Sequence, residues 1–274
     1  MSERLIGIGP DQRLAGILGM PANDQASRIG MVLLSPGTLH RVGNSRANVL
    51  LARRLAASGV PTLRFDFSGN GDSPRRPGVS RTFESAIEEV LWATAALRAA
   101  TGIRDVVLYG HCSGADVAQR AAVHDASVTG LVLSDPIVFA TPYFLFKRYV
   151  PQFFRPRVLM RAPRTLLRMS HPLANPDWAR AIPERSLLTS ELCQLAQRGT
   201  SLLTIFTGGA RDSYRYVGQY RAAFKQADFG ELLTEQLIID ADHLLSAAAP
   251  REALIDATSA FVANLISRQT AVRT

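Results

Sequence analysis

The 274-residue sequence has little of what stabilises secreted proteins or anchors membrane proteins. It contains two cysteines, too few for a disulfide framework. No apolar run approaches the roughly 20 residues that a membrane-spanning helix needs. The first residues lack the pattern of a signal peptide. We therefore expect a reducing, cytoplasmic location, with any contact to a membrane limited to its surface.

One long stretch lacks acidic residues altogether. No Asp or Glu occurs between Asp135 and Asp177, whereas seven cations fall between Lys147 and Arg168. The whole chain has a net charge of +8 and a pI near 10.2. The basic stretch forms either an ordinary solvated face or a surface that attracts acidic partners. The acidic partners that we consider are an acyl carrier protein, a coenzyme A thioester and an anionic membrane. Nucleic acid is not expected as a partner, because no recognised binding module is visible.

Apolar runs alternate with helical patterns along most of the chain. This alternation is typical of βαβ units and predicts an α/β fold with a mostly parallel sheet flanked by helices. Hydrophobic residues make up 47% of the chain and charged residues 20%, an ordinary globular composition. The strands are expected at residues 14–18, 29–34, 62–67, 106–109, 131–134, 201–207 and 237–239.

The region from 137 to 200 interrupts this alternation with prolines, aromatic residues and the basic stretch. It lies between two expected strands, where a connection is usually short. We therefore expect a core formed by residues 1–136 and 201–274, with residues 137–200 inserted as a helical cap, or lid.

The most informative motif is Gly110-His111-Cys112-Ser113-Gly114, which joins an expected strand to an expected helix. Its frame matches the nucleophile elbow G-x-S-x-G, with cysteine in place of the nucleophilic serine. The motif therefore predicts Cys112 as the nucleophile, at a helix amino terminus that favours a thiolate. Two alternatives are a buried, inert cysteine and Ser113 as the nucleophile, although Ser113 has no glycines two positions away.

A thiol nucleophile needs a base, and the base needs an acid to orient it. His243 follows the last expected strand, and Asp212 follows the strand before it. Both are expected at the sheet edge that carries Cys112, in the chain order nucleophile, acid, histidine. Asp240 and Asp242 are too close in sequence to His243 to orient it.

Backbone N–H groups are expected to form the oxyanion hole. One belongs to Ser113, directly after the nucleophile, and the other to Thr38, in the loop after an early strand. Gly37, Leu39 and His111 are expected to contact the substrate.

No cofactor and no metal are expected. No pair of His, Cys or carboxylate residues has ligand spacing outside the turns already assigned. The loop from 65 to 73 contains Gly69 and Gly71 but lacks the G-x-G-x-x-G frame of nucleotide-binding loops. It is interpreted as a structural turn beside the pocket.

With these residues in place, the chain resembles the α/β-hydrolase superfamily, in its serine aminopeptidase-like branch. The resemblance rests on Pro36-Gly37, Asp66-x-x-Gly69-x-Gly71-x-Ser73, the elbow, Asp212 and His243. The loop Arg41-Val42-Gly43-Asn44-Ser45-Arg46 and the cysteine elbow are similar to those of exosortase-associated hydrolases.

A cysteine nucleophile forms a thioester acyl-enzyme, which stays activated for transfer to an amine, alcohol or thiol. The sequence therefore predicts an enzyme that cleaves or transfers acyl groups from esters or thioesters: a thioesterase, an esterase or an acyltransferase. The alternative is a weakly active or inactive hydrolase-fold protein that serves as a binding component of a biosynthetic or membrane-associated system.

Overall fold

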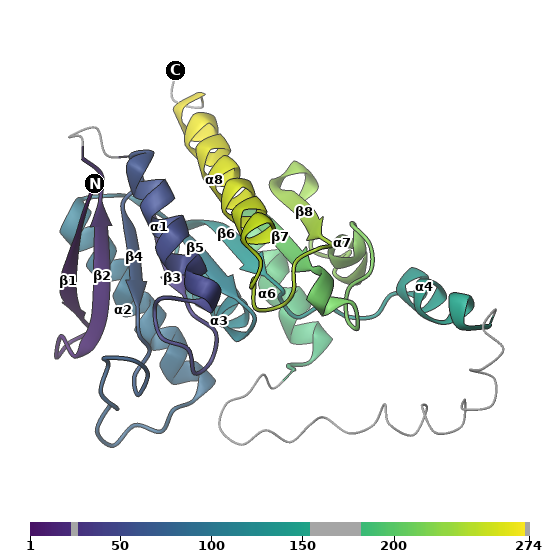
Figure 1. Cartoon of the computed structure of the whole chain (residues 1–274), viewed down its shortest axis with the longest axis horizontal. Coiled ribbons are helices and arrows are strands. Elements are labelled where there is room, and N and C mark those ends of the chain that lie inside the picture. The colour runs from purple at the N-terminus through teal and green to yellow at the C-terminus, as the bar shows by residue number, and fades with distance from the viewer. Residues whose placement is uncertain (23–26, 154–181, 272–274) are drawn as a thin grey trace.

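The computed structural model describes residues 1–22, 27–153 and 182–271. They form one eight-stranded sheet of order β1-β2-β4-β3-β5-β6-β7-β8 (Figure 1). The pairs β1–β2 and β2–β4 are antiparallel, and all other neighbouring strands are parallel, which confirms the mostly parallel sheet. The strands are β1 (Ser2–Ile8), β2 (Leu14–Met20), β3 (Ile29–Leu34), β4 (Thr62–Phe65), β5 (Asp105–His111), β6 (Val128–Ser134), β7 (Ser201–Thr207) and β8 (Leu233–Ile238).

Helices cover both faces of the sheet, so the inner parallel strands β3, β5, β6 and β7 are buried on both sides. In β5, Val106 and Leu108 pack into one core, whereas Val107 and Tyr109 pack into the other. The first core includes α2 (Phe83–Thr101), α3 (Ser113–His124) and α6 (Arg185–Gln197), and the second includes α1 (Ala47–Ala57) and α8 (Ala248–Ala271). The remaining helical segments are η1 (Asn44–Arg46), α4 (Pro142–Phe153), η3 (Gly208–Ala210), α7 (Gln219–Ala223) and η4 (Gly230–Leu232).

Local sequence signals define the ends of α2. The Thr82 hydroxyl accepts the backbone N–H of Ser85, and the Ser85 hydroxyl accepts that of Thr82. This reciprocal pair is a capping box. Gly102 ends the helix with φ 70°, a left-handed conformation that suits glycine.

Two elements differ from the expectations. β1 was not predicted, because its polar residues and mostly exposed side chains hide the strand alternation. A helix was expected over residues 214–227, but α7 begins only at Gln219, after Gly218 at φ 97°. Tyr214 instead stacks on Phe206 of β7, with ring centroids 3.6 Å apart, which fixes the preceding turn against the sheet.

Part of the expected cap is described. α4 extends away from the body of the sheet, and α6 packs against α3 (Figure 1). Residues 154–181 lie outside the described part of the chain, and with them five of the seven cations of the acid-free stretch: Arg155, Arg157, Arg161, Arg164 and Arg168. Among the helices that the structure describes, none is long and apolar enough to cross a membrane.

Candidate active site

The turn between β5 and α3 is a sharp elbow with Cys112 at its apex. Cys112 has φ 54° and ψ −123°, a strained conformation for a non-glycine residue. A Cβ on Gly110 would stand 2.2 Å from the carbonyl oxygen of Gly114, and one on Gly114 would stand 3.0 Å from that of Ser35. The close approach of strand and helix therefore requires both glycines, as the motif predicts. The Cys112 side chain remains partly exposed.

His243 lies beside Cys112, in the loop after β8. A hydrogen bond joins the His243 ring to the Cys112 side chain. The other side of the ring meets Asp135, since Nδ1 lies 2.8 Å from Asp135 Oδ2. Nδ1 therefore donates to the carboxylate, and Nε2 is the nitrogen left to face the nucleophile.

Asp135 follows β6 directly and is 2% exposed. Thr207, at the end of the neighbouring β7, donates its backbone N–H to Oδ1 and its hydroxyl to Oδ2, each at 2.7 Å. With His243, these donors hold the carboxylate at a fixed angle. The three residues that meet here follow one another along the chain as Cys112, Asp135 and His243.

The expectation that Asp212 orients His243 is wrong. The Asp212 side chain is 95% exposed, and its neighbour is Arg148 of α4, with N–O 3.7 Å. The 3₁₀ turn Gly208–Ala210 separates Asp212 from the end of β7. The sequence did hold the better signal: Asp135 comes directly after an apolar strand, whereas Asp212 stands five residues past one.

The contacts between His243, Asp135 and their neighbours determine the pKa values of these two residues. The hydrogen bond to Asp135, and next the one to Cys112, raise the pKa of His243 to about 10. Burial pushes the pKa of Asp135 upward, but the bond from His243, the nearby His111 and the two bonds from Thr207 outweigh it, so that pKa lies below its ordinary value. His243 is therefore protonated at neutral pH, and an imidazolium beside Cys112 favours the thiolate.

Two side chains fix the backbone of His243. The carbonyl oxygen of His243 accepts His111 Nε2–H at 2.9 Å and Asn44 Nδ2–H at 3.2 Å. His111 also bonds the Ser134 hydroxyl through Nδ1 at 2.8 Å. The expectation that His111 contacts the substrate is wrong, because the residue is 2% exposed and both ring nitrogens bond protein groups.

Ser113 connects the elbow to the loop after β3. Its hydroxyl accepts the backbone N–H of Gly37 at 2.8 Å, so this oxygen faces the loop and not His243. As the first residue of α3, Ser113 has a backbone N–H without an intrahelical partner.

Thr38 lies in a tight turn that the Leu39 N–H closes onto the Pro36 carbonyl at 2.9 Å. The Gly37 carbonyl accepts Asn70 Nδ2–H at 2.7 Å and an Arg81 N–H at 2.8 Å. Because the peptide is trans and planar, the N–H of Thr38 points away from these two donors. Leu39 is 40% exposed at the same turn.

The loop from 66 to 73 supports this region as a structural turn. The buried Asp66 forms an ion pair with Arg41 and accepts the Asp72 N–H at 3.0 Å. A Cβ on Gly71 would overlap the Asp66 carboxylate, at 2.3 Å. Asn70 of the same loop holds the Gly37 carbonyl, so the loop sets the position of the turn that contains Thr38.

One cluster in the described part of the chain brings together three residues that could ligate a metal: His111, Asp135 and His243, with ligand atoms within 4.8 Å of one another. His111 uses both ring nitrogens in hydrogen bonds, and His243 Nδ1 is bonded to Asp135. The cluster therefore suits proton transfer better than ion binding.

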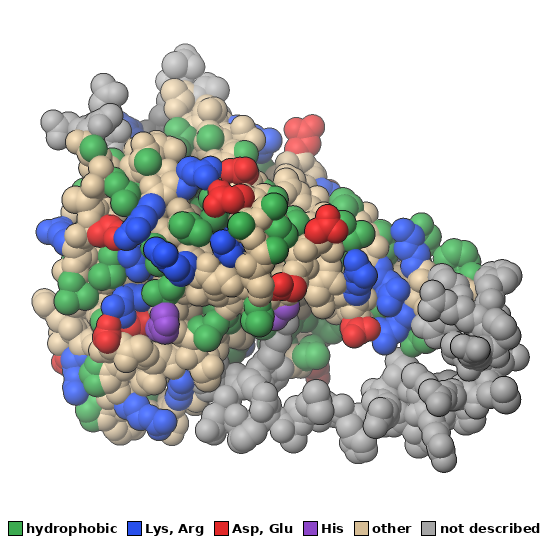
Figure 2. All heavy atoms as spheres, viewed as in Figure 1, with side chains coloured by type: hydrophobic (Ala, Val, Ile, Leu, Met, Phe, Trp, Pro, Cys, Tyr) green, Lys and Arg blue, Asp and Glu red, His purple; other side chains and the backbone are tan. Residues whose placement is uncertain are grey.

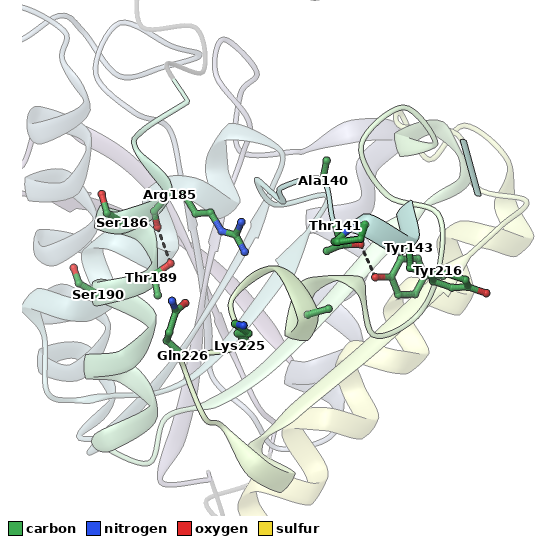
Figure 3. A pocket seen from close by; sticks show the side chains of 12 residues that line it. Ala140, Thr141, Tyr143, Arg185, Ser186, Thr189, Ser190, Tyr216, Lys225 and Gln226 are labelled. Carbon is green, nitrogen blue, oxygen red and sulfur yellow. Dashed lines mark hydrogen bonds between the residues drawn. The ribbon is translucent and has the colours of Figure 1, made fainter. Parts of the chain in front are cut away.

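Two cavities border α4, and neither is lined by Cys112 or His243. One of about 960 Å³ lies between the start of α4, α6 and the end of α7 (Figure 3). The other, of about 470 Å³, is lined by Gly208 and Ile239, which follow β7 and β8, and by residues of α4.

The chain is similar to known proteins in sequence and in fold. The model of the alpha/beta hydrolase family matches residues 31–257. Similar solved structures include the esterase PF2001 of Pyrococcus furiosus (14% identity, 96% of this chain and 90% of that one, TM-score 0.61) and Est1E from Butyrivibrio proteoclasticus (16%, 97% and 100%, 0.61). A proline iminopeptidase of Mycobacterium smegmatis is 14% identical over the full length of both chains, with a TM-score of 0.57. No curated protein matches significantly.

Proposed function

Because the chain belongs to the α/β-hydrolase family, we propose that it is a hydrolase-type enzyme in which Cys112, His243 and Asp135 form the catalytic triad. We propose that it cleaves or transfers acyl groups from esters or thioesters. The observation that carries this proposal is the position of His243, bonded to Cys112 on one side and to a buried carboxylate on the other. An esterase and an iminopeptidase among the similar structures are consistent with chemistry at an acyl carbon.

The first half-reaction follows from this arrangement. The Cys112 thiolate attacks the acyl carbon, and the C=O pair moves onto oxygen. The backbone N–H groups of Ser113 and Thr38 stabilise this oxyanion. The carbonyl re-forms, the bond to the leaving oxygen or sulfur breaks, and His243 Nε2–H protonates the leaving group. The product is a thioester between the acyl group and Cys112.

The second half-reaction uses the same groups in reverse. His243, now neutral, accepts a proton from water, an alcohol, an amine or a thiol as that acceptor attacks the thioester. Asp135 holds the ring in the tautomer with Nδ1–H and stabilises the imidazolium. A thioester intermediate keeps transfer open alongside hydrolysis. Coenzyme A thioesters and acyl carrier proteins are the donors that best suit the basic chain.

Intact-mass spectrometry after mixing the protein with a panel of acyl thioesters tests the proposal. We expect the mass of one acyl group on Cys112 in the wild type and none in Cys112→Ala. Ser113→Ala is the matched control and should still become acylated. Loss of a triad nucleophile lowers turnover by about 10⁶ in comparable enzymes. Acylation that survives Cys112→Ala and disappears in Ser113→Ala would assign the nucleophile to Ser113.

A further inference from the structure

We propose that the cavity between α4, α6 and α7 binds the phosphate-bearing nucleotide end of an acyl thioester, as found in coenzyme A. This inference rests on the proposed function, because it locates the part of the substrate that does not react. Among the described residues that line the cavity, none is acidic (Figure 3).

The cavity contains two cations that have no carboxylate partner among the residues that the structure describes. Within the described ranges, neither Arg185 nor Lys225 forms an ion pair. Arg185 is nevertheless held in place, because its guanidinium donates to the Ala223 carbonyl and stands 5.8 Å from the centroid of the Phe139 ring. A fixed guanidinium with free donors is well suited to phosphate oxygens.

Aromatic rings form the wall opposite these cations. Figure 3 shows the Arg185 side chain extending from the α6 side toward the side that carries Thr141, Tyr143 and Tyr216. Tyr143 and Tyr216 meet edge to face, with centroids 4.8 Å apart, and the Tyr216 hydroxyl bonds Thr141 Oγ1 at 2.7 Å. Tyr143 is 48% exposed, and its ring already stacks on Phe146 with centroids 6.2 Å apart, so a base can extend this aromatic stack only from the side that remains open.

Polar side chains complete the lining. Ser186, Thr189 and Ser190 follow one side of α6, and Gln226 lies beside Lys225 after α7. Hydroxyl and amide groups can bond the sugar and the base edge. A volume of about 960 Å³ lies at the upper end of the range for small-molecule sites. Cations, flat rings, hydroxyls and an amide together match a phosphorylated nucleoside.

The cavity is close enough to the triad for one long substrate to occupy both. Asp135 and the lining residue Ala140 are five residues apart, which limits the distance between their Cα atoms to about 18 Å. The N–H of Ile137 bonds Asp116 Oδ1 at 3.2 Å, which ties this connection to α3 one turn from Cys112. A nucleotide held in the cavity therefore leaves a flexible thioester arm to extend toward Cys112.

Titration calorimetry with adenosine 3′,5′-bisphosphate at about 0.15 M salt tests the site without turnover. We expect saturable binding to the wild type and to Cys112→Ala, weakened at least tenfold in Arg185→Gln/Lys225→Gln. The matched control is Arg28→Gln/Arg104→Gln, which removes the same charge from exposed residues just before β3 and β5. Absence of saturable binding, or equal weakening in the control, would overturn the proposal.

Two further comparisons sharpen the test. Tripolyphosphate should bind at least tenfold more weakly than the nucleotide, and equal binding would overturn the assignment to a nucleotide. In turnover, Arg185→Gln/Lys225→Gln should raise KM at least tenfold for an acyl-coenzyme A while leaving the N-acetylcysteamine thioester of the same acyl group unchanged. Equal losses on both substrates would overturn the proposal, whereas failure of Cys112 acylation with every thioester would count against the proposed function itself.

Discussion

The ends of β6 and β7 offer two aspartates at the same edge of the sheet, in opposite environments. Asp135 follows β6 at once, is buried, and is bonded to His243 and Thr207. Asp212 follows β7 after a 3₁₀ turn, and almost all of its side chain is in solvent near Arg148. Both residues satisfy the chain order of a triad, but only the buried one can hold a histidine in a single tautomer.

The difference shows how burial determines what a carboxylate can do. A buried carboxylate keeps its charge only if donors compensate for lost hydration, and those donors fix its position. An exposed carboxylate is free to rotate, and its ion pairs are screened by salt. Figure 2 shows Lys and Arg side chains gathered near α4, with apolar and a few acidic side chains among them. There Asp212 contributes to the local charge balance beside Arg148.

The largest expected effect separates the two aspartates directly. Asp135→Asn should lower the rate of Cys112 acylation by about 10⁴, the loss seen when the acid of a triad becomes an amide that favours the wrong histidine tautomer. Asp212→Asn should leave the rate unchanged. Time-resolved intact-mass spectrometry with one acyl thioester measures both. A large loss in Asp212→Asn with an active Asp135→Asn would reverse the assignment.

A second effect is expected in thiol reactivity. With a pKa of about 10, His243 remains protonated at pH 6 and supports the thiolate. His243→Ala should therefore slow alkylation of Cys112 by iodoacetamide at pH 6 about a hundredfold, because a free thiol has a pKa of about 8.5. At pH 10 the two proteins should react alike.

At pH 6 the alkylation rate of Asp135→Asn should lie between those of the wild type and His243→Ala, and the rate of Asp212→Asn should equal that of the wild type. The experiment is best done in a Cys193→Ala background, because Cys193 of α6 is the second free thiol. Identical pH profiles for the wild type and His243→Ala would contradict an ion pair between His243 and Cys112.

A smaller effect tests the donors that hold Asp135. Thr207→Val removes the hydroxyl bonded to Asp135 Oδ2 while preserving the shape of the side chain. We expect the free energy of unfolding to fall by about 1.5–3 kcal/mol, the range for hydrogen bonds to charged groups. Thr204→Val is the matched control on β7, since the Thr204 hydroxyl is buried without a partner, and it should be neutral or stabilising. Urea unfolding measures the free energy of unfolding of both variants. An equal loss of stability in the two would contradict the role of Thr207.

The smallest effect concerns the pH dependence of stability. His243 has a folded-state pKa raised above its ordinary 6.5, so the stability gained from its contact with Asp135 is complete below pH 6.5 and disappears as the pH rises through about 10. The difference in urea midpoint between the wild type and Asp135→Asn should therefore narrow between pH 6.5 and 10. The midpoint of Asp212→Asn should track the wild type throughout. A difference that widens with pH would have the wrong sign.

Sequence patterns predicted the features that depend on residues close together in the chain. The parallel sheet follows from alternating apolar runs, and the elbow follows from two glycines flanking a nucleophile. His243 could be found because it is the histidine of the loop that follows the last strand, and this loop emerges at the edge that carries Cys112. These inferences need only the direction of each strand and the point where it ends.

The remaining features depend on geometry that local patterns do not encode. The position of Asp135 directly after its strand favours it in the sequence, but the exposure of Asp212 beside Arg148 is a property of the folded loop. His111 and Asn44 each form a hydrogen bond with the backbone carbonyl of His243, which lies in a loop far along the chain. No local sequence pattern indicates this contact. β1 was missed because its partner β2 covers only its backbone edge, and most of its side chains remain exposed.

The two side chains that bond the His243 carbonyl also bear on the order of folding. His111 and Asn44 stand 132 and 199 residues before His243 in the chain, and Asp135 stands 108 residues before it. Contacts of such separation carry the largest loop-closure entropy and form late. The individual βα units can gain their own structure first, and Cys112 stays without its contact to His243 until the last loop docks. We therefore expect the Cys112 thiol to gain its imidazole partner only in the last stage of folding.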